Sequence, residues 1–344
     1  MPKRTFRIPG EGVPLLDIVS LGRRGPQEAG GRLTAEQIEQ IRRTVQRAPE
    51  VMVKVLGRNS NDLKAAARHF DYIGRKGELE IETDDGERLE GRVGQSLIED
   101  WDLDIDDARR QGDLKAINGR KSPKLIHKLI FSMPTGTPPD RVLAAVRNFA
   151  REEFALQHRY AFVLHTDEPH PHVHLVLKAV SEQGSRLNIK KATLRHWRSE
   201  FARNLRLLGV PANATERAVR GEGRVNKIDG VYRADKRGVS THTRNRVART
   251  TVELAKGDLQ SEPGRQVLLQ TRKEVVAGWR ALVEILNGEG QLELAADVGG
   301  FVDSMSRPRT EKEQLAHAML QRIHQLSEFG VAAPRKSVMV HNGI

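Results

Sequence analysis

Two apolar segments joined by a short polar turn make up residues 160–178, whose sequence is YAFVLHTDEPHPHVHLVLK. Residues 160–165 and 172–180 are each typical of a buried strand, and the tight connection predicts that they pair antiparallel. Side chains of a strand alternate between its two faces, so His172 and His174 should share one face, about 6–7 Å apart. This segment therefore predicts a sheet that carries two imidazoles side by side.

His165 ends the neighbouring strand, so it can supply a third imidazole next to His172 and His174. Three neutral imidazoles suit a divalent transition metal and leave one coordination position open for substrate. Asp167 or Glu168 could hydrogen-bond to one of these metal-binding imidazoles and orient its ring. For His170 three roles stay open: metal ligand, proton shuttle or exposed turn residue. A His-x-His pair also fits zinc hydrolases, cupins and phosphodiesterases, and a histidine-rich surface turn without function is the remaining alternative.

The hydrophobic pattern around this strand pair predicts an α+β fold with a mostly antiparallel central sheet flanked by helices. Residues 1–32 are rich in Gly, Arg and Pro and are expected to be poorly ordered, and residues 210–246 show little periodicity. We expect further strands at 51–55, 78–83, 88–93 and 123–133. Helices are expected at 35–45, 61–74, 140–157, 191–208, 262–287 and 309–328.

The charge of the chain favours a polyanionic partner. Its 344 residues carry a formal net charge of +12, and the sequence pI is about 10.0. Residues 181–250 hold 17 Lys and Arg against 6 Asp and Glu, whereas residues 78–113 hold 14 acids against 4 bases. The basic excess is thus concentrated in one stretch, as expected for a surface that binds nucleic acid. Composition alone fits a DNA-binding protein without chemistry equally well.

Cysteine is absent, so disulfides and thiolate metal sites are excluded and any metal must be held by histidines and carboxylates. No run of about 18 apolar residues is present, and the N-terminus lacks the apolar core of a secretory signal. We therefore expect a cytoplasmic protein without membrane insertion.

Among the three tyrosines, Tyr72 has the most unusual surroundings. Tyr160 begins a buried strand and Tyr232 lies in the Arg-rich stretch, whereas Tyr72 falls about 160° from Phe70 around its expected helix, off the buried stripe. Its expected helical neighbours are basic: Arg68, His69, Arg75 and Lys76. Cations favour a phenolate and bind phosphate, so Tyr72 is a candidate covalent nucleophile. An exposed tyrosine without function is the alternative.

Three motifs in order, spread over residues 51–222, resemble the HUH-type relaxases of conjugative plasmids and integrative elements. They are YIGRKGELE at 72–80, FSMPTGT at 131–137, and His165-x-Asp167 followed by HPHVH at 170–174. The resemblance is to the P mobilisation class, which includes the tumour-plasmid border-nicking relaxase. It implies a ferredoxin-like antiparallel sheet with the histidine pair on a central strand.

The resemblance also implies roles for individual residues. Tyr72 is the expected nucleophile, the metal ligands are His165, His172 and His174, and Ser132 lies near the DNA strand. The chain departs from several relatives at two positions, with Pro169 in place of an acid and Lys178 in place of Asn. Asp167 and Glu168 therefore remain the candidates for the acid that assists Tyr72. The stretch 213–221 resembles a segment that follows the nuclease in long relaxases, and we assign it no chemistry.

The predicted function is a metal-dependent relaxase that nicks single-stranded DNA at an origin of transfer through a 5′-phosphotyrosyl intermediate. Mg²⁺ or Mn²⁺ is the expected metal, and Zn²⁺ also fits the ligands. The resemblance implies accessory relaxosome proteins and a type IV secretion coupling protein as partners, and export of the protein bound to DNA as an option. The expected DNA contacts are Arg68, Arg75, Lys76, Lys190, Lys191, Arg195 and Arg198.

The expected domains are a basic N-terminal arm with a short helix (1–50), the nuclease domain (51–222) and an Arg-rich linker with a helical C-terminal region (223–344). Two rival functions remain: a non-catalytic DNA-binding accessory protein, and a zinc hydrolase of small phosphoesters. Only the relaxase requires a covalent adduct between Tyr72 and DNA.

Overall fold

The computed structural model describes residues 17–24, 32–57, 61–115, 123–223 and 229–328. The chain forms two compact units: residues 33–215 make the first, and residues 17–32 join 216 onward in the second. The predicted nuclease span, 51–222, overlaps the first unit. Residues 1–16 and 25–31 of the N-terminal arm, and residues 329–344 at the end of the chain, lie outside the described residues.

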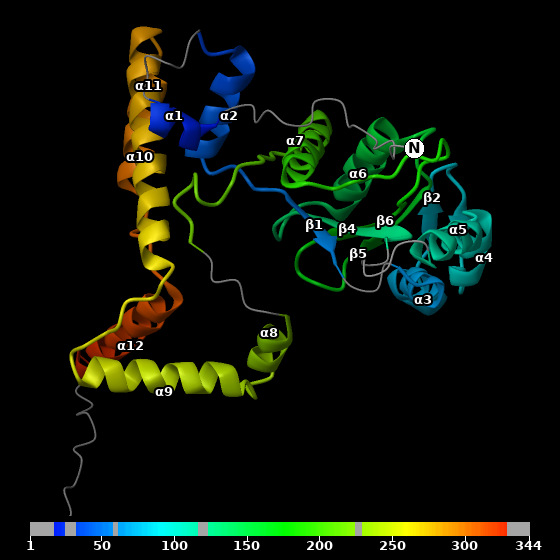
Figure 1. Ribbon diagram of the computed structural model, residues 1–344. Helices are drawn as coiled ribbons and strands as arrows, with labels where there is room; N and C mark the ends of the chain where they lie inside the picture. The colour runs from blue at the N-terminus through cyan, green and yellow to red at the C-terminus, as the bar shows by residue number, and fades with distance from the viewer. Residues whose placement is uncertain (1–16, 25–31, 58–60, 116–122, 224–228, 329–344) are drawn as a thin grey trace, which may run out of the picture. The chain divides into compact units, whose positions relative to one another are not determined.

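The first unit is built on a six-stranded sheet in which every neighbouring pair is antiparallel (Figure 1). The strand order is β1-β4-β6-β5-β2-β3. Their bounds are Met52–Leu56 (β1), Ile126–Ser132 (β4), His172–Lys178 (β6), Tyr160–His165 (β5), Ile81–Thr83 (β2) and Arg88–Leu89 (β3). The α+β fold with a central antiparallel sheet is confirmed, and the histidine-bearing strand β6 is central in it.

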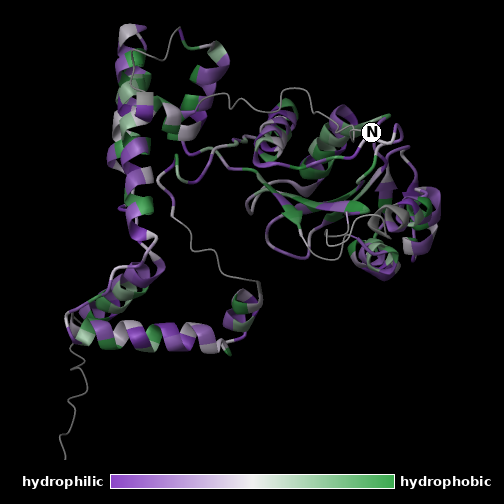
Figure 2. Cartoon of the chain, viewed as in Figure 1, coloured by the Kyte–Doolittle hydropathy of each residue, from purple (hydrophilic) through white to green (hydrophobic). Residues whose placement is uncertain are grey.

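Helices cover both faces of this sheet. Helices α6 (Pro139–Phe154) and α7 (Lys191–Leu207) pack on one face, and α3 (Leu63–Ile73) with α4 (Gly94–Asp100) packs on part of the other. Helices α2 (Ala35–Val45) and α5 (Leu103–Lys115) complete the unit. Most of the strand residues are hydrophobic and the helices are mixed, as Figure 2 shows. The sequence did not predict α4 and α5, because their region is dominated by acids.

The register decides which side chains share a face. Leu129 and Phe131 of β4 and Val173, Leu175 and Leu177 of β6 pack with α6 and α7. By alternation, His172 and His174 point to the other face, where Val176 of the same strand contacts the α3 cluster. The predicted common face of the two imidazoles is therefore confirmed.

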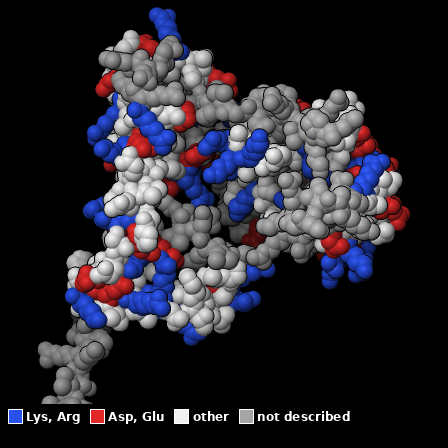
Figure 3. Space-filling view, in the orientation of Figure 1, with Lys and Arg blue, Asp and Glu red and all other residues white. Residues whose placement is uncertain are grey.

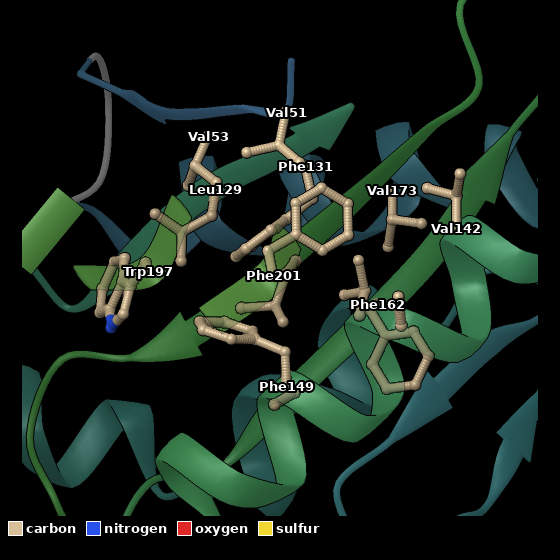
Figure 4. Packing of buried hydrophobic residues seen from close by; sticks show 14 of the residues in the cluster. Val51, Val53, Leu129, Phe131, Val142, Phe149, Phe162, Val173, Trp197 and Phe201 are labelled. Carbon is tan, nitrogen blue, oxygen red and sulfur yellow. The ribbon is translucent and has the colours of Figure 1, made fainter. Parts of the chain in front are cut away.

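The core between the sheet and α6 and α7 is rich in aromatic rings (Figure 4). Phe131 is fully buried there, with its ring centroid 4.9 Å from that of Phe149 and 5.2 Å from that of Phe201. Replacing Phe131 by Ala should lower the free energy of unfolding by about 3–5 kcal/mol, because the cavity cannot close fully. Equilibrium urea unfolding measures this, with Leu207→Ala on the exposed side of α7 as the control. Equal losses in both variants would contradict this packing.

His127 makes the stability of this unit depend on pH. It is buried in β4, where a ring N–H donates to the Leu187 carbonyl over 3.2 Å, and burial lowers its pKa to about 4. The unfolded chain takes up a proton near pH 6.5 and the folded chain does not, so stability is full above that pH and falls as pH drops toward 4. We expect a loss of about 2 kcal/mol between pH 7 and 5 from this group. His127→Gln should make the urea midpoint depend less steeply on pH over this range, and an unchanged slope would contradict the assignment.

The stretch that begins at residue 213 is held at the edge of the sheet, beside β1. Asn213 is buried, its N–H donates to the Pro49 carbonyl, and its side chain donates to Thr44 and Glu50. Glu50 also accepts hydrogen bonds from the backbone and hydroxyl of Thr215. These contacts fasten the end of the first unit beside β1, which is a structural role.

The second unit is helical in its described part. It contains α1 (Ile18–Arg24), α8 (Asp229–Lys236), α9 (Thr241–Ala255), α10 (Arg265–Gly288), α11 (Leu292–Asp303) and α12 (Glu311–Glu328). Here the sequence analysis was wrong in two places. Residues 18–24 form a helix that packs on α10. The two helices meet at Gly22 and Gly278, where a Cβ would collide with the backbone of the facing helix. Residues 229–236 and 241–255 are also helical. Packing of α9 on α12 stabilises the second of these segments, whose own apolar stripe is weak. None of the described helices is long and apolar enough to cross a bilayer.

Candidate nuclease site

The three predicted imidazoles come together at one end of the sheet. His165 ends β5 and lies directly opposite His172 in the register, and His174 follows on the same face of β6. One nitrogen from each ring lies within 4.8 Å of the other two. The ring centroids are 5.2 Å apart for His165 and His172, 4.5 Å for His165 and His174, and 5.3 Å for His172 and His174. The predicted triad is thus assembled by strand pairing alone.

Hydrogen bonds orient two of these rings. His165 Nε2 lies 2.7 Å from the Ile73 carbonyl, to which its N–H donates, and His172 Nδ1 lies 3.1 Å from the His170 carbonyl. In each case one nitrogen is occupied by the backbone, which leaves the other for a cation. Burial, with the neighbouring imidazoles, lowers the pKa of His174 to about 3, and burial also lowers the pKa of His165. Both rings are therefore neutral at pH 7, as a metal ligand must be.

The donor set fits a divalent transition metal. His174 is buried, and its Nδ1 has no hydrogen-bond partner among the described residues, which is costly for a polar atom unless something else satisfies it. His165, His172 and His174 would hold the metal. Arg75 lies 3.2 Å from His165 Nδ1, so its guanidinium and a bound cation would compete for that nitrogen.

Tyr72 lies beside this triad on α3. Its side chain is 54% exposed, whereas Phe70 and Ile73 on the same helix are fully buried, so its predicted position off the buried stripe is confirmed. Its ring centroid is 6.2 Å from that of His174 at an interplanar angle of 87°, and 6.0 Å from that of His69 in a stacked arrangement. The structure thus brings an exposed phenol next to the imidazole cluster.

The basic residues around Tyr72 are arranged differently from the prediction. Helix α3 ends at Ile73, and Arg75 and Lys76 follow in a 3-10 turn with positive φ values of 52° and 59°. The turn is tight because Gly77, at φ 104°, packs against Gly91, where a Cβ would lie 2.6 Å from the Gly91 Cα. Glycines 74 and 77 break the helical pattern that would have made Arg75 and Lys76 helical neighbours of Tyr72.

This turn places Arg75 over the tyrosine. Its guanidinium carbon is 5.6 Å from the centre of the Tyr72 ring, and it forms an ion pair with Asp167. Asp167 therefore lies in the site but is held by Arg75. Arg68 is exposed and lies 4.0 Å from Asp62, which caps α3. Lys76 is in the same turn as Arg75, and no described contact joins it to Tyr72.

The remaining predicted residues lie at the same end of the sheet. Ser132 is buried and pairs with His172 in the register. His170 is exposed, with its Nδ1 3.1 Å from the Thr135 hydroxyl, so it is not part of the triad. Glu168 is exposed in the turn between β5 and β6.

The basic helix α7 lies elsewhere. It packs with α6 against the face of the sheet opposite to the imidazoles. Lys190 precedes its first turn, close in sequence to Leu187, which contacts His127 at the other end of β4. The structure therefore does not bring the four predicted DNA contacts of this helix, Lys190, Lys191, Arg195 and Arg198, to the triad. Figure 3 shows that basic side chains are spread over both units.

The sequence analysis placed His69 beside Tyr72 but gave it no role in the site, and it missed Lys128. The His69 ring lies beside both Tyr72 and His174, with its centroid 6.0 Å and 6.4 Å from theirs, and burial together with the charge of Lys128 lowers its pKa to about 3. Lys128 lies on β4, on the imidazole face of the sheet. The spacing of His69 three residues before Tyr72 was visible, but the place of Lys128 depends on strand register.

Comparison with known proteins agrees with this geometry. Residues 72–206 match the family model of the relaxase nuclease domain, described as MobA/VirD2-like. The chain is also similar to the T-DNA border endonuclease VirD2 of Rhizobium radiobacter, with 24% identity over 199 residues. That alignment covers 50% of this chain and 43% of the relative, so the chain matches less than half the length of that protein. The matched region begins at Tyr72 and contains the three histidines, so residues 72–206 are similar to the MobA/VirD2-like nuclease domain of relaxases.

Proposed function

We propose that the protein is a relaxase that nicks one DNA strand at an origin of transfer and joins itself to the 5′ end of the product through Tyr72. The observation that carries this proposal is the position of an exposed tyrosine ring 6.2 Å from the buried ring of His174. Small-molecule hydrolases and accessory DNA-binding proteins have no need of such a tyrosine. The match to the relaxase nuclease domain supports the same conclusion.

The proposed reaction is a transesterification. The Tyr72 phenolic oxygen attacks the scissile phosphorus, the bond from phosphorus to the 3′ oxygen breaks, and the 3′-hydroxyl leaves with a proton. The number of phosphoester bonds is unchanged, so a 3′-hydroxyl can later reverse the step and rejoin the strand. Arg75, which lies over the Tyr72 ring, is placed to hold a phosphate oxygen. Asp167, in its ion pair with Arg75, is then a positioning group for that cation, and Glu168 stays a candidate proton acceptor.

A divalent metal held by His165, His172 and His174 would supply charge neutralisation at the phosphate oxygens. Mn²⁺ or Mg²⁺ is the proposed ion, and three imidazoles suit Mn²⁺ or Zn²⁺ better than Mg²⁺. The role of the chain itself is to present three imidazoles, keep two of their rings in place through the Ile73 and His170 carbonyls, and hold Tyr72 beside them.

The wider assignment follows from the proposed reaction. Single-stranded DNA is the substrate, with relaxosome accessory proteins and a type IV coupling protein as partners in mobilising a plasmid or integrative element. We propose that the protein acts in the cytoplasm, with export while bound to DNA as an option.

The experiment uses a pool of single-stranded oligonucleotides of random sequence, incubated with the protein and Mn²⁺. Protein boiled in detergent is separated, and any DNA that remains attached is sequenced. The proposal predicts attached strands that share a 5′-terminal sequence, and none when a chelator is present. Cleaved strands with free 5′-phosphates would identify an ordinary metal nuclease instead. Bound but uncleaved DNA would favour the accessory protein.

A further inference from the structure

A cavity of about 350 Å³ lies beside the last residues of β5. Its lining comes from residues 78–80 and 82 around the start of β2, from 88 in β3, from 143 and 147 in α6, and from 162–164 in β5. Phe162 and Leu164 pack with the core under α6, so the cavity lies on the face opposite to the imidazoles. Leu164 is followed directly by His165, which places the cavity at the end of the sheet that holds the triad.

Strand pairing explains why there is space at this position. In the described structure β2 pairs with β5 only through Glu82 and Thr83. A longer antiparallel ladder would place Glu80 opposite Leu164, but the two segments diverge there and the cavity lies between them. Residues 78–80 follow the turn that brings Arg75 over Tyr72. The cavity is therefore enclosed by the segment that follows the tyrosine and by the strand that ends in a histidine of the triad.

Part of the wall is apolar and part is a fixed ion pair. The apolar part is supplied by three partly exposed leucines, Leu79, Leu143 and Leu164. Arg147 donates hydrogen bonds to both carboxylate oxygens of Glu82, and its guanidinium carbon lies 6.0 Å from the centre of the Phe162 ring. A bidentate pair of this kind holds both side chains in place and cancels their charges. The cavity thus offers a rigid surface to a flat, partly apolar group.

Two further carboxylates, Glu78 and Glu80, line the cavity and are exposed. Glu80 lies 3.8 Å from Arg88, a loose ion pair between two exposed side chains. Carboxylates repel a phosphate, but they accept hydrogen bonds from the amino groups of bases. Arg75 and Lys76 precede these acids in the chain and can hold a phosphate. This order of cations and acids suits a nucleotide whose phosphate stays at the turn while its base enters the cavity.

We propose that the cavity receives one unpaired base of the DNA strand close to the phosphate that Tyr72 attacks, and that it prefers a base with an exocyclic amino group, cytosine or adenine. This inference rests on the proposed function and names a determinant of the sequence that is cut. The leucines would contact the faces of the base, and Glu78 or Glu80 would accept a hydrogen bond from its amino group. The volume of the cavity falls in the range of small-ligand sites, about 300–1,000 Å³.

The test measures binding of a fluorescent single-stranded oligonucleotide, selected from the random pool, by anisotropy in chelator, so that no cleavage occurs. Each nucleotide in turn is replaced by an abasic one. At one position this should raise the Kd of the wild type roughly tenfold. Removing only the amino group there, by uracil for cytosine or purine for adenine, should raise it roughly fivefold. Leu143→Trp fills the cavity and should remove the effect of the abasic nucleotide at that position while the other positions keep theirs.

Glu78→Gln and Glu80→Gln provide a test that does not depend on repacking α6, because both side chains are exposed. The quantity compared is the ratio of the Kd values for the strands without and with the amino group. In one of the two variants this ratio should fall to about one, since a Gln side chain can donate as well as accept. The matched control is Glu90→Gln, which removes the same charge from an exposed residue outside the cavity lining and should leave the ratio unchanged.

The proposal is overturned if no abasic position loses its effect in Leu143→Trp, or if the ratio in both Glu78→Gln and Glu80→Gln equals that of the wild type. Covalent capture by the wild type is scored separately with the same oligonucleotide. Adduct formation without such a position removes the base-binding cavity and leaves the relaxase proposal standing. If no adduct forms, the oligonucleotide is selected by binding alone, and the test of the cavity is unchanged.

Discussion

Conversion of Tyr72 to Phe should abolish the covalent adduct with DNA and lower the rate of nicking by at least about a thousandfold. The change removes the only atom that is proposed to attack phosphorus. The ring and its contacts with His69, His174 and Arg75 can remain, because the 54% exposed side chain is not part of the core. The measurement is a denaturing gel of labelled single-stranded DNA after boiling in detergent, with and without chelator.

Two controls separate chemistry from folding in this variant. Binding of single-stranded DNA should be the same for Tyr72→Phe and the wild type, since no charge changes. Tyr232→Phe alters an equally exposed tyrosine (51%) in the second unit and should leave the adduct intact. If Tyr72→Phe still forms the adduct and Tyr232→Phe does not, the nucleophile is Tyr232.

His172→Ala and His174→Ala should each abolish nicking and weaken Mn²⁺ binding by at least about tenfold, the lower limit seen when residues that merely orient a ligand are lost. Each variant removes one of the three nitrogens that lie within 4.8 Å of each other. Calorimetric titration with Mn²⁺ gives the affinity directly and does not depend on DNA.

The control for these variants is His242→Ala, which removes an exposed imidazole from α9 in the second unit. It should bind Mn²⁺ as the wild type does. Unchanged affinity in both His172→Ala and His174→Ala would show that the triad is not the metal site, and the proposed chemistry would lose its basis.

The central features of the site could be predicted because they depend on local sequence. A two-residue period places His172 and His174 on one face, and a short turn places His165 in the adjacent strand. The exposed position of Tyr72 follows from the helical period of residues 63–73. These relations span few residues, and tertiary structure did not alter them.

Features that depend on distant pairing could not be predicted. Lys128 reaches the site only because β4 lies between β1 and β6, which sequence periodicity does not show. The basic helix α7 was predicted to contact DNA, and its apolar face packs with α6 on the side of the sheet opposite to the imidazoles, which sequence periodicity does not show. Arg75 reaches Tyr72 through a left-handed turn and not along a helix, because Gly74 and Gly77 interrupt the period.

The most direct test of the relaxase account is to identify the residue that carries DNA. Wild-type protein trapped with its selected oligonucleotide is digested with trypsin and nuclease, and the modified peptide is sequenced by mass spectrometry. The account predicts a nucleotide attached through phosphate to Tyr72, in the peptide that follows Arg68. A nucleotide on any other residue, or an adduct that forms equally well in chelator, would contradict it.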